Sequence, residues 1–96
     1  MIIKETEVFT KWINGIKDIK ALAAIDTRLN NIRIYNHLGK CRSVGGMVSE
    51  IKIDYGPGYR IYFTKKGDNF VILLAGSTKQ KQDLAIKKAQ KIAQML

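Results

Sequence analysis

The sequence contains only one cysteine, Cys41, so it cannot form a disulfide bond within the chain. Its first residues, MIIKETEVF, include three charged side chains and therefore hold no apolar segment of signal-peptide length. No apolar run approaches the roughly 20 residues that a membrane-spanning helix needs, and the longest, residues 70–75, is only the length of a strand. We therefore expect a protein of the reducing cytoplasm without a membrane segment.

Residues suited to metals or cofactors are also scarce. His37, the only histidine, has no cysteine or histidine at the spacing of a metal site. Gly39, Gly45 and Gly46 match neither a phosphate-binding loop nor a dinucleotide fingerprint. Cys41 has no partner in a Cys-x-x-Cys motif, which favours a structural over a nucleophilic role. The sequence therefore predicts neither a metal site nor a cofactor.

Positive charge is what the sequence has in excess. Its 17 Lys and Arg residues outnumber 8 Asp and Glu residues, which gives a formal net charge of +9. The excess extends along the chain and is densest over residues 79–96, where five lysines accompany one aspartate. Such a charge favours contact with phosphates, anionic membranes or an acidic partner. For residues 79–96 alone, the solvated face of a surface helix is an equally good interpretation.

A chain of 96 residues is expected to form a single domain, residues 1–96, with one hydrophobic core. Residues 1–4 predict a short strand. Thr6 is placed to cap a helix that reaches Ile16 at most, since Asn14-Gly15 favours its end. Asp18 is placed to cap a second helix to about residue 35. So short a connection predicts an antiparallel helical hairpin. The core-facing residues expected on the second helix are Ile19, Leu22, Ile25, Leu29 and Ile32.

After Gly39 the pattern changes from helical to alternating. Residues 49–55 and 59–64 predict two strands joined by a turn at Gly56-Pro57-Gly58. Residues 70–75 are apolar on both faces, which predicts a central strand covered by helices. Residues 41–44 predict a further strand, at the edge. A last helix over about residues 80–94 would direct one stripe to the core, made of Ile86, Ala89, Ala93 and Leu96.

The predicted class is therefore α+β, with a small, mainly antiparallel sheet, two N-terminal helices and one C-terminal helix. Short connections predict a meander rather than parallel crossovers, with the helices on one face of the sheet.

The polar residues of the two central strands form the candidate site. If the apolar set faces the helices, then Glu50, Lys52, Arg60 and Tyr62 face outward, and the hairpin places the first two across from the last two. A carboxylate, an amine and a guanidinium on one open face are suited to bind an anion beside a proton-transfer group. The alternative is an ordinary solvated sheet face whose polar residues pair across strands.

Three basic residues outside these strands add to the candidate site. Lys79 lies at the entry to the last helix, where a helix N-terminus attracts anions. Lys40 and Arg42 flank Cys41 near the start of the sheet, and each could contact a phosphate or simply lie on the surface.

Three segments of the sequence resemble the RelE/ParE superfamily, and specifically its HigB-like group of addiction-module killer proteins. These segments are TEVFTKWINGIKD, GGMVSEIKIDYGPGYRIYF and LLAGSTKQKQDLAIKKAQ. The resemblance extends over nearly the whole chain, and its implied fold agrees with the elements predicted above. It implies a toxin of a type II toxin–antitoxin system, which cleaves mRNA on the ribosome without a metal and thereby inhibits translation.

The resemblance also implies roles for individual residues. Arg60 matches the phosphate-stabilising arginine, Glu50 and Lys52 match positions of the general base, and Lys79 lies near the basic residue that stabilises the leaving oxygen. No tyrosine or histidine follows Lys79, although many relatives carry one there that stacks on a base or donates a proton. The residues assigned to RNA or ribosome contacts are Lys40, Arg42, Tyr62 and Lys81.

The implied partners are the ribosome, mRNA and a cognate antitoxin, which in this group is usually a HigA-like helix-turn-helix protein encoded nearby. Two alternatives remain open at this stage. One is a gyrase-inhibiting toxin of the ParE branch, which shares the fold without this set of residues. The other is a catalytically inactive module that binds an antitoxin or nucleic acid.

Overall fold

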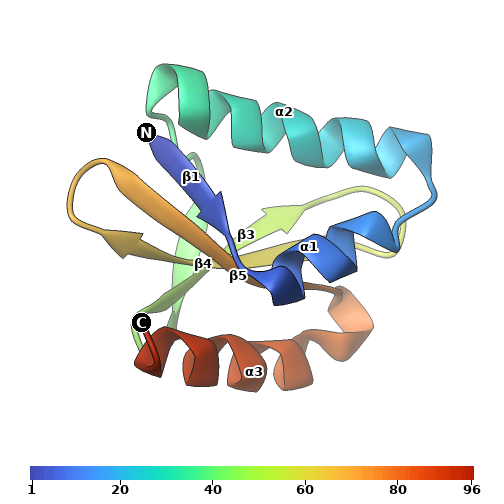
Figure 1. The fold of residues 1–96 in the computed structure, drawn as a ribbon. Coiled ribbons are helices and arrows are strands. Elements are labelled where there is room, and N and C mark those ends of the chain that lie inside the picture. The colour runs from blue at the N-terminus through green and yellow to red at the C-terminus, as the bar shows by residue number, and fades with distance from the viewer.

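The computed structural model describes residues 1–96 and contains three α-helices and a five-stranded mixed sheet (Figure 1). The predicted α+β class and the order of the elements are confirmed. In chain order the elements are β1 (Ile2–Glu5), α1 (Glu7–Asn14), α2 (Ile19–Tyr35), β2 (Cys41–Gly45), β3 (Val48–Ile53), β4 (Tyr59–Lys66), β5 (Phe70–Thr78), a 3₁₀ turn η1 (Lys79–Lys81) and α3 (Gln82–Gln94). None of the helices is long and apolar enough to span a membrane.

The strands are ordered β1-β5-β4-β3-β2 across the sheet. As predicted, β2 to β5 form an antiparallel meander in which β2 is an edge strand. The strand predicted over residues 1–4 is also present, as β1, but its place in the sheet was not predicted. It pairs in parallel with β5, from Ile2 opposite Phe70 to Glu5 opposite Leu73. The apolar strand β5 therefore lies inside the sheet, as its composition indicates.

Side-chain caps define the starts of the first two helices, as predicted. The Thr6 hydroxyl accepts a hydrogen bond from the backbone N–H of Phe9 at the start of α1. The Asp18 carboxylate accepts bonds from the N–H groups of Lys20 and Ala21 at the start of α2. These contacts satisfy amide donors that have no partner within the helix.

Helix α2 departs from the prediction in part of its packing. The principal neighbour of α1 is β5, and Phe9 of α1 joins Ala21 and Ile25 of α2 in one hydrophobic cluster. The predicted core stripe of α2 is wrong at its start, because Ile19 is 80% exposed and Ala21 takes the buried position. From Ile25 onward the stripe is confirmed, since Ile25, Leu29 and Ile32 are buried.

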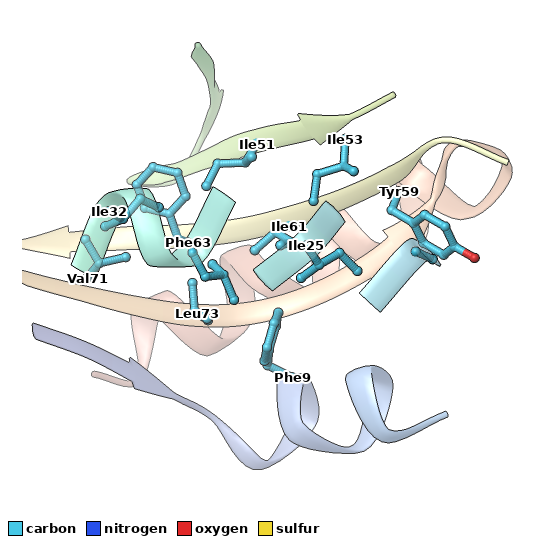
Figure 2. Packing of buried hydrophobic residues seen from close by; sticks show 12 residues of the cluster. Phe9, Ile25, Ile32, Ile51, Ile53, Tyr59, Ile61, Phe63, Val71 and Leu73 are labelled. Atoms are coloured by element: carbon cyan, nitrogen blue, oxygen red, sulfur yellow. The ribbon is translucent and has the colours of Figure 1, made fainter. Parts of the chain in front are cut away.

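The helices lie on both faces of the sheet, which corrects the prediction that they share one face. Figure 1 shows α2 above the sheet and α3 beneath it. On the α2 face, Ile25 and Ile32 pack with Ile61, Phe63 and Leu73 of the strands, and Phe9 of α1 joins them (Figure 2). On the α3 face, a smaller cluster joins α3 to the strands: Val48, Tyr62, Leu74, Ala75, Ala85 and Ala89.

An irregularity in β5 supplies part of the α3 cluster. Phe63 pairs with Leu73 and Tyr62 with Ala75, so Leu74 is an extra residue in β5. Such a bulge interrupts the alternation, and both Leu74 and Ala75 join the α3 side. The small side chains Ala85 and Ala89 form the buried surface of α3. Leu96 was predicted to extend this surface, but it lies beyond the helix and is 53% exposed.

Candidate functional site

The register of the sheet brings the predicted polar residues together. Glu50 lies opposite Tyr62, and Lys52 lies opposite Arg60, as the hairpin prediction required. The neighbouring strand adds Arg42, which lies opposite Glu50. Since directly opposed residues share a sheet face, these side chains all belong to the α3 face.

This face is not open at the candidate site, which corrects the prediction from alternation alone. Helix α3 packs across β5, β4 and β3 and covers much of the face. Glu50 is only 3% exposed, Arg60 is 5% exposed and Tyr62 is fully buried. The buried carboxylate and guanidinium are therefore fixed parts of the interior, whereas Lys52 remains half exposed.

Beside the covered residues lies a hollow of about 540 Å³, which we call the polar hollow. Its lining includes two carboxylates, Glu50 and Asp54, together with Cys41 and Gln82. Five basic residues complete the lining: Arg28, Lys40, Arg42, Lys52 and Arg60. Basic side chains outnumber acidic ones, so the polar hollow is suited to bind an anion such as a phosphate group.

Both oxygens of the Glu50 carboxylate are engaged. Arg42 Nε donates to Oε1 at 2.7 Å, and Gln82 Nε2 donates to Oε2 at 3.0 Å. The hydrogen bond from Arg42, and then the charge of Glu50, raise the pKa of the Arg42 guanidinium above its ordinary value. A buried carboxylate with these partners is better suited to hold arginines in place than to accept a proton from a substrate.

Arg60 retains unused hydrogen-bonding capacity. Its Nη1 donates to the carbonyl of Gly58 at 3.3 Å, while its Nε is buried and has no hydrogen-bond partner. The nearest anion is Glu50, whose Oε2 lies 3.8 Å from that Nε and is too distant for a hydrogen bond. An unpartnered donor on a buried guanidinium is costly to the fold. Arg60 also lines the polar hollow, so another part of its side chain faces that space.

Lys52 and Arg28 occupy the outer part of the polar hollow. The Lys52 amine is 3.4 Å from the Asp54 carboxylate, and both groups are exposed to solvent. The Arg28 guanidinium donates to the carbonyls of Lys52, Leu38 and Lys40 at 3.1 to 3.3 Å. Arg28 thus joins α2 to β3 and to the segment that carries Lys40.

Sequence reasoning missed Arg28, Gln82, Asp54 and the position of Cys41 in the hollow. Asp54 follows directly after β3 and lies two residues beyond Lys52. Its closeness in sequence to that predicted site residue was the signal that could have identified it. No local pattern identifies Arg28 or Gln82, because their partners lie 10 to 32 residues away along the chain.

Tyr62 lies beneath the polar hollow rather than in its lining. Its hydroxyl group and that of Ser77 are 3.2 Å apart and form a buried hydrogen bond. Burial is the main cause that raises the pKa of Tyr62, with a further contribution from the charge of Glu50, while the Ser77 hydrogen bond lowers it. A fully buried phenol cannot contact RNA without movement of α3.

The two remaining predicted residues lie outside the polar hollow. The backbone N–H of Lys79 donates to the carbonyl of Gly58 at 2.7 Å, and Gly58 also accepts from Arg60. Lys79 is therefore beside the Arg60 end of the site.

Lys81 instead lines a second hollow, which we call the apolar hollow. Its other lining residues are Trp12, Gly76, Ser77, Thr78, Leu84, Ala85 and Lys88. No group of three or more His, Cys, Asp or Glu side chains in the structure could hold a metal ion.

Comparison with known proteins gives one informative relative. No protein-family model matches the chain. An uncharacterized protein of Haemophilus influenzae is 37% identical to it over 94 residues, which span 98% of this chain and 94% of the relative. Identity at this level over nearly the full length of both sequences means that the chain belongs to the same protein family as this Haemophilus influenzae protein.

Proposed function

We propose that this protein is a RelE-like toxin of the HigB-like group, and that it acts in the cytoplasm as a metal-independent endoribonuclease on ribosome-bound mRNA. The observation that carries this proposal is the polar hollow, in which Lys52 lies directly opposite Arg60 among five basic side chains. RNA presents phosphates to such a site, and the adjacent 2′-hydroxyl needs only a base and charge stabilisation to attack.

In the proposed reaction the 2′-oxygen attacks the neighbouring phosphorus and the bond to the 5′-oxygen breaks. Lys52 takes the proton of the 2′-hydroxyl as the uncharged amine and becomes the ammonium, because its side chain is accessible whereas the Glu50 carboxylate is buried and engaged. Arg60 stabilises the negative charge that grows on the phosphate oxygens. Lys79, beside Gly58 and Arg60, stabilises the leaving 5′-oxygen, which takes a proton from water to become the 5′-hydroxyl group.

The geometry changes the role that we assign to Glu50. A carboxylate that accepts hydrogen bonds from Arg42 and Gln82 and lies beside Arg60 orients the two guanidinium groups. Lys40 and Arg42 then bind the flanking RNA backbone from the rim of the polar hollow.

The proposed partners are the ribosome, mRNA and a HigA-like antitoxin. Co-expression with the product of an adjacent reading frame should restore growth and yield a complex that purifies intact. If, in this co-expression, the chain purifies without that product and growth arrest continues, the antitoxin assignment is wrong.

The test of the activity is induced expression in bacteria with mapping of newly formed mRNA 5′ ends. Lys52→Ala should reduce cleavage by about 10²-fold or more, since removal of a general base typically costs that much. This exposed residue is chosen because its replacement leaves the interior intact. Arg60→Lys, which keeps one positive charge, and the double variant Lys52→Ala/Arg60→Ala extend the series.

A matched control is Lys65→Ala/Lys66→Ala, which removes two exposed positive charges at the far end of β4. This variant should cleave like the wild type. Cleavage that persists in Lys52→Ala/Arg60→Ala would show that the assigned residues are wrong. Growth arrest with DNA damage and no new mRNA ends would instead support the gyrase-inhibiting alternative. RNA binding without cleavage in the wild type would support the inactive module.

A further inference from the structure

The apolar hollow lies beside the last part of β5, between α1 and α3, and has a volume of about 340 Å³. It exists because β1 pairs with β5 only as far as Leu73, after which the chain turns away into α1. Gly76, Ser77 and Thr78 therefore have no strand neighbour on that side. A hollow of this size is at the lower end of the range for ligand pockets, about 300 to 1,000 Å³.

The walls of the apolar hollow are built from Trp12 and Leu84. Gly76 allows the Trp12 ring to lie directly against β5, since a Cβ atom at position 76 would be 2.1 Å from Trp12 Cε3. Leu84 is 74% exposed, although it lies on a helix whose neighbouring residue Ala85 is buried. An exposed large aliphatic side chain beside an aromatic ring at the rim of a hollow offers a surface that suits an apolar group.

The charges around the apolar hollow indicate the kind of partner. Lys88 of α3 and Lys81, the residue directly before that helix, both line it together with Leu84. None of its lining residues is acidic. A partner with carboxylates on both sides of an apolar side chain complements this arrangement.

We propose that the apolar hollow is the docking site for an acidic segment of a partner protein. The segment inserts one large apolar side chain between Trp12 and Leu84 and places carboxylates against Lys81 and Lys88. A nucleic acid fits less well, because the polar hollow has five basic side chains whereas this one has two beside an apolar wall. The proposal does not depend on RNA cleavage, since its residues are distinct from Lys52 and Arg60.

The experiment is an NMR titration of the isotope-labelled full chain with synthetic peptides. The probe is a short amphipathic peptide in which glutamates flank two leucines. A peptide with alanine in place of leucine and one with lysine in place of glutamate are the matched controls. We expect saturable shifts of the Trp12 indole N–H and the Leu84 methyl groups with the first peptide only.

Variants of α3 and of the residue before it connect the shifts to the proposed contacts. Leu84→Ser should weaken binding by about tenfold or more through loss of apolar contact. Lys81→Glu/Lys88→Glu should weaken it by at least about tenfold, because two attractions become repulsions. The control Lys87→Glu/Lys91→Glu makes the same change of charge at exposed positions of α3 outside the hollow and should change the affinity by less than about twofold.

Three results would overturn the proposal. One is the absence of shifts at Trp12 and Leu84 up to millimolar peptide. Another is an equal response to the alanine peptide, which would reduce the effect to general charge attraction. The third is a single-stranded RNA that shifts these signals when the acidic peptide does not, which would assign the apolar hollow to nucleic acid.

Discussion

The two faces of the sheet come from the same alternating strands but bury different chemistry. The α2 face holds a cluster of twelve buried hydrophobic residues. The α3 face holds a cluster of six, and beside it lie all four of the buried polar residues: Glu50, Arg60, Thr64 and Ser77. Polar burial opposes folding unless every group is paired. The difference indicates that the α2 face mainly stabilises the fold, while the α3 face carries the buried polar groups on which the proposed site depends.

The strongest test of this comparison is the removal of the buried carboxylate. Glu50→Ala should lower the free energy of unfolding by about 3–5 kcal/mol, because Arg60 would remain buried without its counter-ion. Urea unfolding measures the change. Glu50→Gln keeps the shape and part of the hydrogen bonding and should cost less. A loss below about 1 kcal/mol for Glu50→Ala would mean that the pair contributes as little as a surface salt bridge.

The corresponding change on the α2 face is Ile25→Ala. Ile25 is fully buried in the cluster of Figure 2, and its truncation should cost about 2–5 kcal/mol through lost burial and a residual cavity. At a temperature where the variant is still folded, its RNA cleavage should equal that of the wild type. A parallel loss of cleavage would show that the two faces are not independent.

Local signals explain why much of the fold is predictable. The caps at Thr6 and Asp18 act within a few residues, and Gly56-Pro57-Gly58 determines which residues of its two strands are opposed. The pairing of Lys52 with Arg60 follows from that hairpin, so this part of the site was predicted.

What could not be predicted depends on contacts between distant segments. The alternation of β3 and β4 does not reveal that α3 covers their polar side, because a helix with Ala85 and Ala89 on its buried stripe can pack on either face. The extra residue at Leu74 depends on pairing with β4. Arg28 is part of the polar hollow only because the segment before β2 returns to α2.

A smaller effect is expected at the boundary between the two faces. Gly76→Ala would place a Cβ atom 2.1 Å from the Trp12 ring, and overpacking of this kind costs about 1–3 kcal/mol. Gly15→Ala is the matched control near the same tryptophan, since its Cβ would lie 3.4 Å from the Trp12 carbonyl. Thermal unfolding compares the two variants. Equal stabilities would show that the Trp12 ring moves freely away from β5.

The smallest effect concerns the phenol that underlies the polar hollow. Burial raises the pKa of Tyr62 in the folded protein above the ordinary value of 10.0, so the folded state holds this proton more tightly than the unfolded state does. The resulting stability is complete below pH 10.0 and falls as the pH rises through the higher folded value. The free energy of unfolding of Tyr62→Phe should therefore fall less steeply with rising alkaline pH than that of the wild type. At neutral pH the same variant should be less stable by about 0.5–1.5 kcal/mol, because it lacks the hydrogen bond to Ser77. Tyr55 also has a raised pKa, through burial and then its bond to Asp18, so Tyr55→Phe in the Tyr62→Phe background should flatten the profile further. Urea unfolding across the alkaline range measures both slopes, and parallel curves for wild type and Tyr62→Phe would mean that this phenol is accessible to solvent and available to RNA after all.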